Sequence, residues 1–472
     1  MPINSFLYPG AKVVPPFTVA NSIRLNQGDD PDMKKTIGAP TSNRKFSVSC
    51  WVKLSNLGVQ RNLWGLGATS GATGLSVRFQ DDDTLDFFDW NGSGNNFGYS
   101  TNQVFRDASA WSHFLFAVDT EQSTAHNRVR IYHNGVEIEK TNLTDNPGDP
   151  SEDANLTIAD GHTFKVGDDN AGANEWAGYI AEFVYIDGLQ LTPSSFGQFN
   201  DDSPTIWEPI DVTGLTFGNN GFYLDFEDSS NLGNDANGGT DLTETNIAAT
   251  DQSTDTCTNN FATFNPLKFS FEDSAVRDPT YSEGNLVALH HESGHKCPAF
   301  STIAANSGKW YCEVKWLAVN GSYPVNQYTG VVNIDANVTR NWNVLGYFYR
   351  GDGTQYVVGS GSSFGATYTT NDIIGIFMDL DNNKLYFSKN GAMQNSGDPT
   401  SGSTGTGAIS LAANTYYAFM TEDYNNGKTS INFGSPEFSI SSGNSDPNGY
   451  GNFEYDPQGY YALNTKNLAE FG

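Results

Sequence analysis

Residues 46–52 read Phe-Ser-Val-Ser-Cys-Trp-Val, and this stretch decides the fold class. Every second residue from Phe46 to Val52 is apolar, so these side chains share one face when the backbone is extended. Trp51 falls on the opposite face. Because such alternation is typical of a strand with one buried side, the stretch predicts a β-strand within a sheet.

Similar strand patterns occur outward from this stretch in both halves of the chain. They cover residues 111–118, 129–136 and 176–188, and then 308–316, 373–380 and 384–392. Asn134-Gly135 and Asn390-Gly391 each separate two strand-like runs, which is the strongest short-range signal for a hairpin. The two halves therefore share one plan, and we expect two sandwiches rather than a short solenoid repeat.

The composition agrees with this expectation and limits the function. The 472 residues include 54 Asp and Glu against 25 Lys and Arg, a formal net charge of −29. Nucleic-acid binding needs a basic surface that displaces counterions, so nucleic acid is not an expected partner. The 31 Phe, 22 Tyr and 9 Trp supply large core side chains, and the 49 Gly suit many turns. We predict an all-β protein.

The predicted organisation has five parts. They are an N-terminal arm (1–21), a first sandwich (22–210), an acidic, turn-rich connector (211–265), a second sandwich (266–440) and a C-terminal tail (441–472). The connector contains Phe222, Tyr223 and Phe226, which favour burial, so we expect it to pack on a sandwich instead of forming a floppy linker.

Signals for export, membrane insertion and covalent cross-links are weak. The N-terminal stretch 1–17 has no basic region and is interrupted by prolines, so we expect no secretory signal. No apolar run approaches the roughly 18 residues of a membrane span. The cysteines are widely spaced, which argues against a disulfide framework or a zinc ribbon and favours small buried side chains: Cys50, Cys257, Cys297 and Cys312.

One stretch matches a zinc-protease signature, since residues 291–295 read His-Glu-Ser-Gly-His. That chemistry places both histidines on one helix face, whereas this stretch follows a strand-like run and contains Gly294. On a strand the two histidines would lie about 13 Å apart, too far to share an ion. Glu313 is a third ligand by spacing alone, and we expect an accidental match.

Glycoside hydrolysis is the second enzymatic alternative, because jelly rolls also carry glycanases. The reaction needs two carboxylates about 5–9 Å apart across the sugar. Glu182 and Asp187 in the 176–188 strand have an odd spacing, which predicts opposite faces. We therefore expect a protein without catalytic residues.

Several acidic loops leave two interpretations open. Asp and Asn oxygens suit calcium, but they are also ordinary in the turns of β-proteins. Solvated turns are the expected case and calcium is the alternative, with no other cofactor. The calcium candidates are Asp29, Asp30, Asp81, Asp83, Asp168 and Asp169.

Aromatic residues beside polar ones are the best candidates for a binding site. Sugars are held by an aromatic face that stacks on the ring and by polar groups that bond the hydroxyls. Core packing is the competing role for each residue. The candidates are Trp90 and Asn91, which precede an Asn-Gly-Ser-Gly turn, together with Trp176, Trp342, Tyr347 and Tyr349.

Longer patterns resemble two known families. Residues 22–188 carry FSVSCWVK, WSHFLFAV, RIYHNGVEI and GYIAEFVYIDG in this order, which resembles a laminin-G/concanavalin-like jelly roll. Residues 266–434 carry SGKWYCEVKW, DIIGIFMDLDNNKLYFSKNGA and INFG, which resemble a SPRY (B30.2-like) domain. The resemblance implies two jelly-roll-like sandwiches.

The order of the modules resembles that of virion proteins of tailed bacteriophages, marine ones especially. This implies a non-enzymatic structural or adhesion protein of the virion, such as a tail fibre, a spike or a capsid-surface protein. Its expected partners are other virion proteins and a host cell-surface polysaccharide, and the resemblance implies a homo-oligomer. A purely architectural capsid decoration protein and a glycan- or peptide-cleaving hydrolase are the alternatives.

Overall fold

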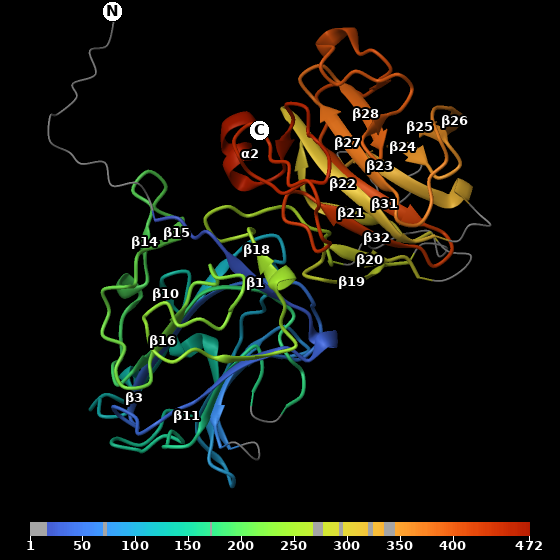
Figure 1. Ribbon diagram of the computed structural model, residues 1–472. Coiled ribbons are helices and arrows are strands. Elements are labelled where there is room, and N and C mark those ends of the chain that lie inside the picture. The colour runs from blue at the N-terminus through green and yellow to red at the C-terminus, as the bar shows by residue number, and fades with distance from the viewer. Residues whose placement is uncertain are drawn as a thin grey trace, which may run out of the picture.

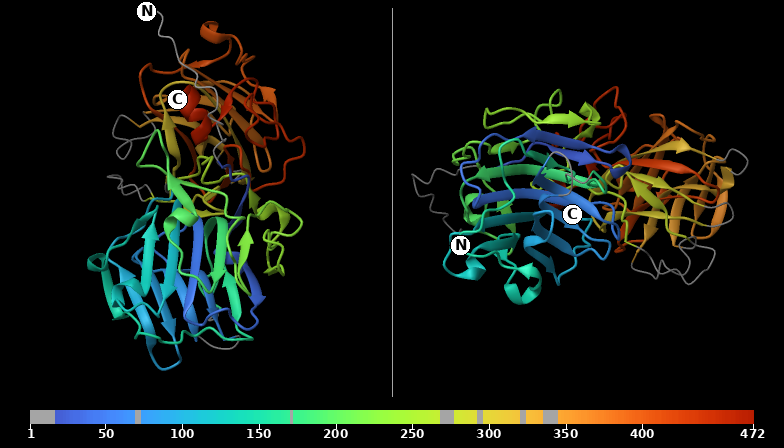
Figure 2. Two further views of the ribbon diagram at one scale, coloured as in Figure 1. Left: turned by 90° about the vertical axis from the view of Figure 1, so that its left-hand side faces the viewer. Right: turned by 90° about the horizontal axis from the view of Figure 1, so that it is seen from below.

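The computed structural model describes residues 17–68, 73–169, 172–267, 277–291, 296–319, 324–334 and 345–472. The chain forms two β-sandwiches that touch along one side, the first drawn blue to green and the second yellow to red (Figures 1 and 2). The prediction of an all-β protein with two sandwich domains is confirmed.

The first sandwich consists of two facing sheets. One sheet has the order β10-β9-β8-β3-β13-β1-β18, with β16 paired to β13. Its strands are β10 (Val136–Glu137), β9 (Val129–His133), β8 (Ser112–Asp119), β3 (Lys45–Leu54), β13 (Gly178–Asp187), β1 (Ser22–Leu25), β18 (Gln252–Ser253) and β16 (Phe222–Leu224). The predicted strand at 46–52 lies within β3, at the centre of this sheet.

The other sheet of the first sandwich carries the candidate site and has the order β11-β7-β6-β5-β4-β12-β2-β17. Its strands are β11 (Leu143–Gly148), β7 (Asn95–Thr101), β6 (Leu85–Trp90), β5 (Gly74–Phe79), β4 (Arg61–Gly67), β12 (Thr163–Val166), β2 (Asp32–Thr36) and β17 (Thr243–Thr245). We refer to it as the β4–β7 sheet.

An aromatic core lies between these two sheets. Alternate residues of β3, including Phe46, face the inner side of the β4–β7 sheet. The Trp64 ring stacks on Phe164 at 5.6 Å and meets Phe116 edge-on at 5.9 Å. Large rings fill the space between sheets with few residues, which is why a chain of modest hydrophobic content has a complete core.

The connector adds strands to both sheets of the first sandwich. β16 pairs with β13, β17 pairs with β2, and β18 pairs with β1. Phe222 and Phe226 are buried in the core of that sandwich. The aromatic residues that predicted a packed connector therefore hold it against the first sandwich.

The second sandwich also has two facing sheets, of orders β19-β20-β32-β22-β27-β28-β29 and β21-β31-β23-β24-β25-β26. The first comprises β19 (Thr280–Ser282), β20 (Val287–Leu289), β32 (Lys428–Asn432), β22 (Lys309–Ala318), β27 (Ile373–Asp379), β28 (Lys384–Lys389) and β29 (Ala392–Met393), with β30 (Ile409–Ser410) paired to β28 and β33 (Tyr461–Ala462) paired to β22. The second comprises β21 (Ala299–Ala305), β31 (Tyr417–Asp423), β23 (Gln327–Asn333), β24 (Gly346–Arg350), β25 (Thr354–Val357) and β26 (Ser360–Ser363).

The C-terminal tail folds back on the second sandwich. Its strand β33 runs parallel to β22, and it ends in the helix α2 (Thr465–Phe471). The side chain of Asn464 caps this helix by accepting from the backbone N–H of Asn467 at 2.9 Å. Among the helices that the structure describes, none is long and apolar enough to cross a bilayer.

Several hydrogen bonds join the two sandwiches. The Tyr179 hydroxyl donates to the carbonyl of Gly284 at 3.0 Å. Arg24 donates to the carbonyl of Pro436 at 3.3 Å, and the hydroxyls of Ser253 and Ser435 lie 2.8 Å apart. The contacts of Arg24 and Ser253 meet residues just after β32. The junction therefore consists of the turn between β19 and β20 and the segment that follows β32.

The four cysteines are free thiols. Cys50, Cys297 and Cys312 are buried, as predicted, and Cys257 is half-buried beside the Trp51 cluster. Burial raises the pKa of the Cys50 thiol above its ordinary value.

Candidate functional site

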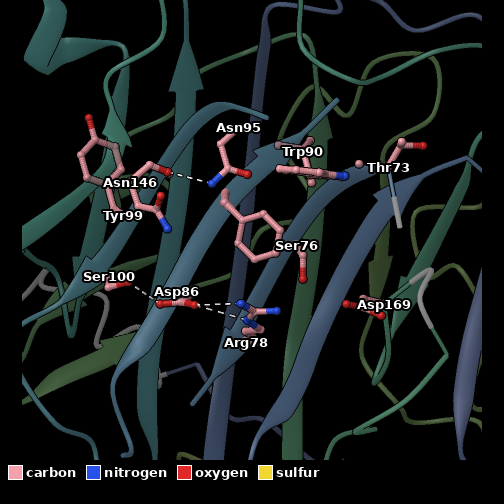
Figure 3. A pocket seen from close by; sticks show the side chains of 14 residues that line it. Thr73, Ser76, Arg78, Asp86, Trp90, Asn95, Tyr99, Ser100, Asn146 and Asp169 are labelled. Atoms are coloured by element: carbon pink, nitrogen blue, oxygen red, sulfur yellow. Dashed lines mark hydrogen bonds and ion pairs between the residues drawn. The ribbon is translucent and has the colours of Figure 1, made fainter. Parts of the chain in front are cut away.

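A groove of about 410 Å³ lies on the outer face of the β4–β7 sheet, on the side away from the core. We call it the Trp90 groove and define it by Ser76, Arg78, Asp86, Phe88, Trp90 and Asn95, with Asn146 and Asp169 at its ends. Figure 3 shows these side chains gathered over neighbouring strands of one sheet.

Strand alternation in β6 places three groove residues on the outer face. Leu85 and Phe87 are buried in the core between the sheets. Asp86, Phe88 and Trp90 occupy the intervening positions and line the groove. An aromatic pair two residues apart therefore lies side by side on the outside of the sheet, where both rings are half-buried.

The floor of the groove is a row of residues that runs across the strands. Gly65 of β4 lies opposite Ser76 of β5, Ser76 opposite Phe88 of β6, and Phe88 opposite Gly98 of β7. Glycine and serine are too small to cover the Phe88 ring. The row is therefore a shallow trough with one aromatic face at its middle.

Glycine is required at two positions beside the rings. Gly74 lies opposite Trp90, and a Cβ there would sit 2.4 Å from the carbonyl oxygen of Leu66. A Cβ on Gly98 would sit 2.1 Å from the carbonyl oxygen of Asn146. Because close backbone approach excludes larger residues at both places, no side chain from these two positions covers the rings.

Charged and hydroxyl groups form one wall. Asp86 lies opposite Arg78 and Ser100 on the two adjacent strands. It accepts from Arg78 Nη2 at 3.2 Å, from Ser100 Oγ at 2.5 Å and also from the amide of Gln80. The Arg78 guanidinium lies over the Phe88 ring at 4.8 Å, so this wall fixes the ring as well.

Amide groups form the opposite wall. Asn95 lies across from Trp90 and donates to the carbonyl of Asn146 at 2.8 Å. The Ser76 hydroxyl on the floor is buried and has no hydrogen-bond partner within the part of the chain that is described. A buried hydroxyl without a partner is costly, so Ser76 is the polar group of the floor best placed to bond a ligand.

Asn91, which was predicted together with Trp90, has a different role. It is exposed in the turn after β6 and is not among the groove-lining residues. Its side-chain oxygen accepts from the backbone N–H of Ser93 at 3.0 Å and of Gly94 at 3.2 Å. Asn91 therefore shapes the turn that follows Trp90.

The structure corrects three of the predicted aromatic ligand-binding residues. Trp176 is fully buried against Phe79, with ring centroids 5.5 Å apart. Tyr347 and Tyr349 lie in the core of the second sandwich. Polar neighbours in sequence suggested exposure, but both tyrosines face inward from β24. Trp342 lies outside the described residues.

Two of the six predicted calcium-binding aspartates, Asp83 and Asp168, pair with cationic side chains. Asp83 is buried and meets Arg106 at 2.8 Å and Arg61 at 3.6 Å. Asp168 pairs with Lys165 at 2.6 Å. Asp29, Asp30 and Asp81 are exposed, and Asp169 lines the groove. Within the described ranges, no group of three or more His, Cys, Asp or Glu side chains is arranged to hold a metal ion.

The zinc-protease match receives no support from its neighbours. Residues 292–295 lie outside the described part of the chain, and His291 follows β20, where its ring meets the Thr280 hydroxyl. Glu313, the third ligand by spacing, is buried and accepts from the Tyr311 hydroxyl at 3.0 Å and the backbone N–H of Tyr455 at 2.7 Å. Its oxygens are committed to holding the C-terminal tail.

The carboxylates considered for glycoside hydrolysis are also engaged in the fold. Glu182 accepts from the Tyr223 hydroxyl at 2.7 Å, and burial raises the pKa of its carboxyl to about 8. Asp187 accepts from the backbone N–H of Thr41 at 2.9 Å. Both residues belong to β13 in the other sheet, so neither lines the Trp90 groove.

Sequence reasoning missed Ser76, Arg78, Asp86 and Asn95. Alternation in Gly-Leu-Ser-Val-Arg-Phe (74–79) places Ser76 and Arg78 on one face, and this signal was available. Which strand lies beside which, and in what register, is set by long-range pairing. The row from Gly65 to Gly98 is therefore visible only in the folded sheet.

Comparison with known proteins agrees with the architecture of the first half. Residues 29–193 match the Concanavalin A-like lectin/glucanases superfamily, in its Laminin_G_3 model. The matched range includes the whole Trp90 groove. The first sandwich is therefore similar to laminin-G/concanavalin-like domains over this range.

Other similarities cover parts of the chain or are remote. Ran-binding protein 9 of Danio rerio is 30% identical over 116 residues, which is 23% of this chain and 19% of that protein. The chain thus spans less than a fifth of the relatives that it matches there. The SPRY domain of human HERC1 is similar to 31% of this chain and 87% of its own, at 16% identity and a TM-score of 0.25.

The laminin-G-like pair LG4-5 of the mouse laminin alpha1 chain is similar over 91% of this chain and 86% of its own, at 8% identity and a TM-score of 0.30. The chain is therefore similar to laminin-G-like and SPRY proteins, and the family match is confined to residues 29–193.

Proposed function

We propose that this is a non-enzymatic binding protein that holds a glycan in the Trp90 groove. One observation carries the proposal. Phe88 and Trp90 lie half-buried on the outer face of the β4–β7 sheet, beside the hydroxyl of Ser76, which has no hydrogen-bond partner in the described part of the chain. Apolar ring faces flanked by hydrogen-bonding groups are the arrangement that a pyranose ring requires, since it has an apolar face and a rim of hydroxyls.

Binding without turnover agrees with the carboxylates in the groove. A glycosidase needs two carboxylates on opposite sides of the scissile bond, one of them free to act as nucleophile or base. Both oxygens of Asp86 accept hydrogen bonds from groups of the protein itself. Asp86 therefore stabilises the groove wall and the position of Arg78.

We further propose that the protein is displayed in many copies on a tailed-phage virion and that the glycan belongs to the host surface. The order of the two modules and the net charge of −29 support this location. Like charge keeps densely displayed copies from associating nonspecifically. Weak single sites gain avidity when many copies engage one surface.

The groove is tested by changing Trp90→Ala in the full chain and measuring binding to an array of bacterial surface oligosaccharides. We expect the signals to fall at least about tenfold, since stacking and burial of the ring face are lost. Tyr416→Ala removes an exposed aromatic residue of the second sandwich and should leave binding unchanged. Wild-type signals that survive Trp90→Ala would refute the groove as the site.

The location is tested separately by antibody labelling and electron microscopy of purified phage particles. Label on the tail tip or the shell would support display on a virion. Unlabelled particles, with the protein left in the soluble fraction of the lysate, would overturn that location and leave the groove proposal intact.

A further inference from the structure

We infer that the Trp90 groove selects short neutral oligosaccharides and rejects acidic ones, with Asp169 and Asp86 as the selecting groups. This inference rests on the proposed glycan-binding function and adds the chemical class of the ligand. It is argued from the charges, the hydrogen bonds and the length of the groove.

The charged groups of the groove disfavour an anionic ligand. Among the described residues, its lining contains the carboxylates of Asp86 and Asp169 and one cation, Arg78. Arg78 bonds Asp86 through Nε at 3.3 Å and through Nη2 at 3.2 Å. Asp86 already neutralises the guanidinium. A uronate or sulfate that enters the groove would therefore lose its water of hydration without gaining an unpaired cation as a partner.

Asp169 stands at one end of the trough. The Cβ position of Gly65, in the floor row, would lie 2.9 Å from the Cα of Asp169. The backbone of Asp169 therefore passes directly over the β4 end of the floor. A carboxylate at this end accepts hydrogen bonds from sugar hydroxyls and repels an anionic substituent.

The remaining polar groups suit hydroxyls. Ser76 Oγ has no partner within the described chain, and its residue is 5% exposed. Arg78 uses Nε and Nη2 for Asp86, so Nη1 is the guanidinium nitrogen that Asp86 does not engage. A neutral sugar supplies both donors and acceptors, and it can therefore bond Ser76 and Arg78 together.

The length of the groove indicates a short chain. From Gly65 to Gly98 the floor crosses three strand spacings, about 14 Å in all. Asn146 closes the β7 end, where its carbonyl oxygen would lie 2.1 Å from a Cβ on Gly98. With Asp169 at the other end, the trough seats more than one sugar but not a long internal stretch of polymer.

The experiment compares neutral and acidic glycans on one array, with the full chain and its Asp169→Asn and Trp90→Ala variants. The neutral set includes malto-, cello- and laminari-oligosaccharides, and the acidic set includes oligogalacturonates, oligomannuronates and sulfated oligosaccharides. We expect the wild-type signals that depend on Trp90 to come from neutral glycans. Asp169→Asn should raise binding of acidic glycans about fivefold or more, because a like charge is removed at close range.

Asp81→Asn is the matched control, since it makes the same change of charge at an exposed site outside the groove. It should leave the acidic signals low. Acidic glycans that bind the wild type as well as neutral ones, in a Trp90-dependent way, would overturn the selectivity and leave the proposed function standing. The lack of any Trp90-dependent signal would instead refute the function itself.

Discussion

Lys53 and Asp255 form an ion pair of 2.7 Å in which each side chain is 1% exposed. Lys53 belongs to β3 of the first sandwich, and Asp255 belongs to the connector. Lys53 also donates to the carbonyl of Phe261 at 2.8 Å, and Asp255 accepts from Trp111 Nε1 at 3.0 Å. The pair thus fixes the connector at the point where it leaves for the second sandwich, and burial lowers the pKa of Lys53.

Replacement of Lys53 should lower the stability of the fold. Lys53→Met leaves the Asp255 carboxylate buried without its cation, so we expect the free energy of unfolding to fall by about 3–5 kcal/mol. Urea denaturation followed by tryptophan fluorescence measures the change. Lys45→Met on the same strand breaks a more exposed pair with Glu121, in which the side chains are 27% and 42% exposed, and should cost no more than about 1 kcal/mol. Equal losses in the two variants would show that burial of the pair is unimportant.

Local signals predicted much of this fold. Asn134 and Gly135 adopt φ angles of 48° and 78° between β9 and β10, and Asn390 and Gly391 adopt 47° and 78° between β28 and β29. Both predicted hairpins are therefore confirmed, because the residue types themselves specify this backbone conformation.

The site was only partly accessible from sequence. Trp90, which was predicted as a ligand-binding residue, lines the groove, whereas Trp176, which also follows polar residues, lies beneath Phe79 in the core. The difference depends on which sheet face each tryptophan occupies and on which strand lies opposite. Those relations come from pairing between distant segments, which a short window of sequence does not contain.

Glu182 should make stability depend on pH. It sits at a bulge in β13 with φ of 48°, is buried, and has a pKa raised from 4.5 to about 8 by that burial. The folded state keeps its proton while the unfolded state loses it above pH 4.5. The contribution of this residue to stability is therefore fully present below pH 4.5 and is lost as the pH rises to about 8.

Glu182→Gln removes the ionisable carboxyl group and keeps a side-chain oxygen that accepts the hydrogen bond of the Tyr223 hydroxyl. We expect the variant to match the wild type near pH 4.5 and to exceed its unfolding free energy by about 3–5 kcal/mol at pH 8. Denaturation curves across this range measure the difference. The exposed Glu139→Gln serves as the control. A difference in unfolding free energy between Glu182→Gln and wild type that stays constant at all pH values would contradict the assignment of this pH dependence to the Glu182 carboxyl.

Substitution by alanine should reduce stability at Trp176 and glycan binding at Trp90. Trp176→Ala opens a cavity in the core and should lower the unfolding free energy by about 3–5 kcal/mol. Trp90→Ala removes a half-buried ring from the outer face, so its effect on stability should stay below about 1.5 kcal/mol while glycan binding is lost. Thermal melts and the array together separate the two roles. A strong loss of stability in Trp90→Ala would indicate a core residue.

Ser76 offers the sharpest separation of binding from stability. Its hydroxyl is buried without a partner in the described chain, so Ser76→Ala removes an unsatisfied polar group. We expect the unfolding free energy to stay constant or rise by up to about 1 kcal/mol, while affinity for the neutral glycan falls about two- to tenfold. Calorimetric titration and urea denaturation of the same samples give both values.

Ser100→Ala is the matched control, because Ser100 lies on the same wall and donates to Asp86 at 2.5 Å. Loss of that charge-assisted bond should cost stability, about 1.5–3 kcal/mol. If Ser76→Ala instead lost stability as Ser100→Ala does and left affinity unchanged, the Ser76 hydroxyl would have a structural role. The floor of the groove would then contribute only the Phe88 ring to the ligand.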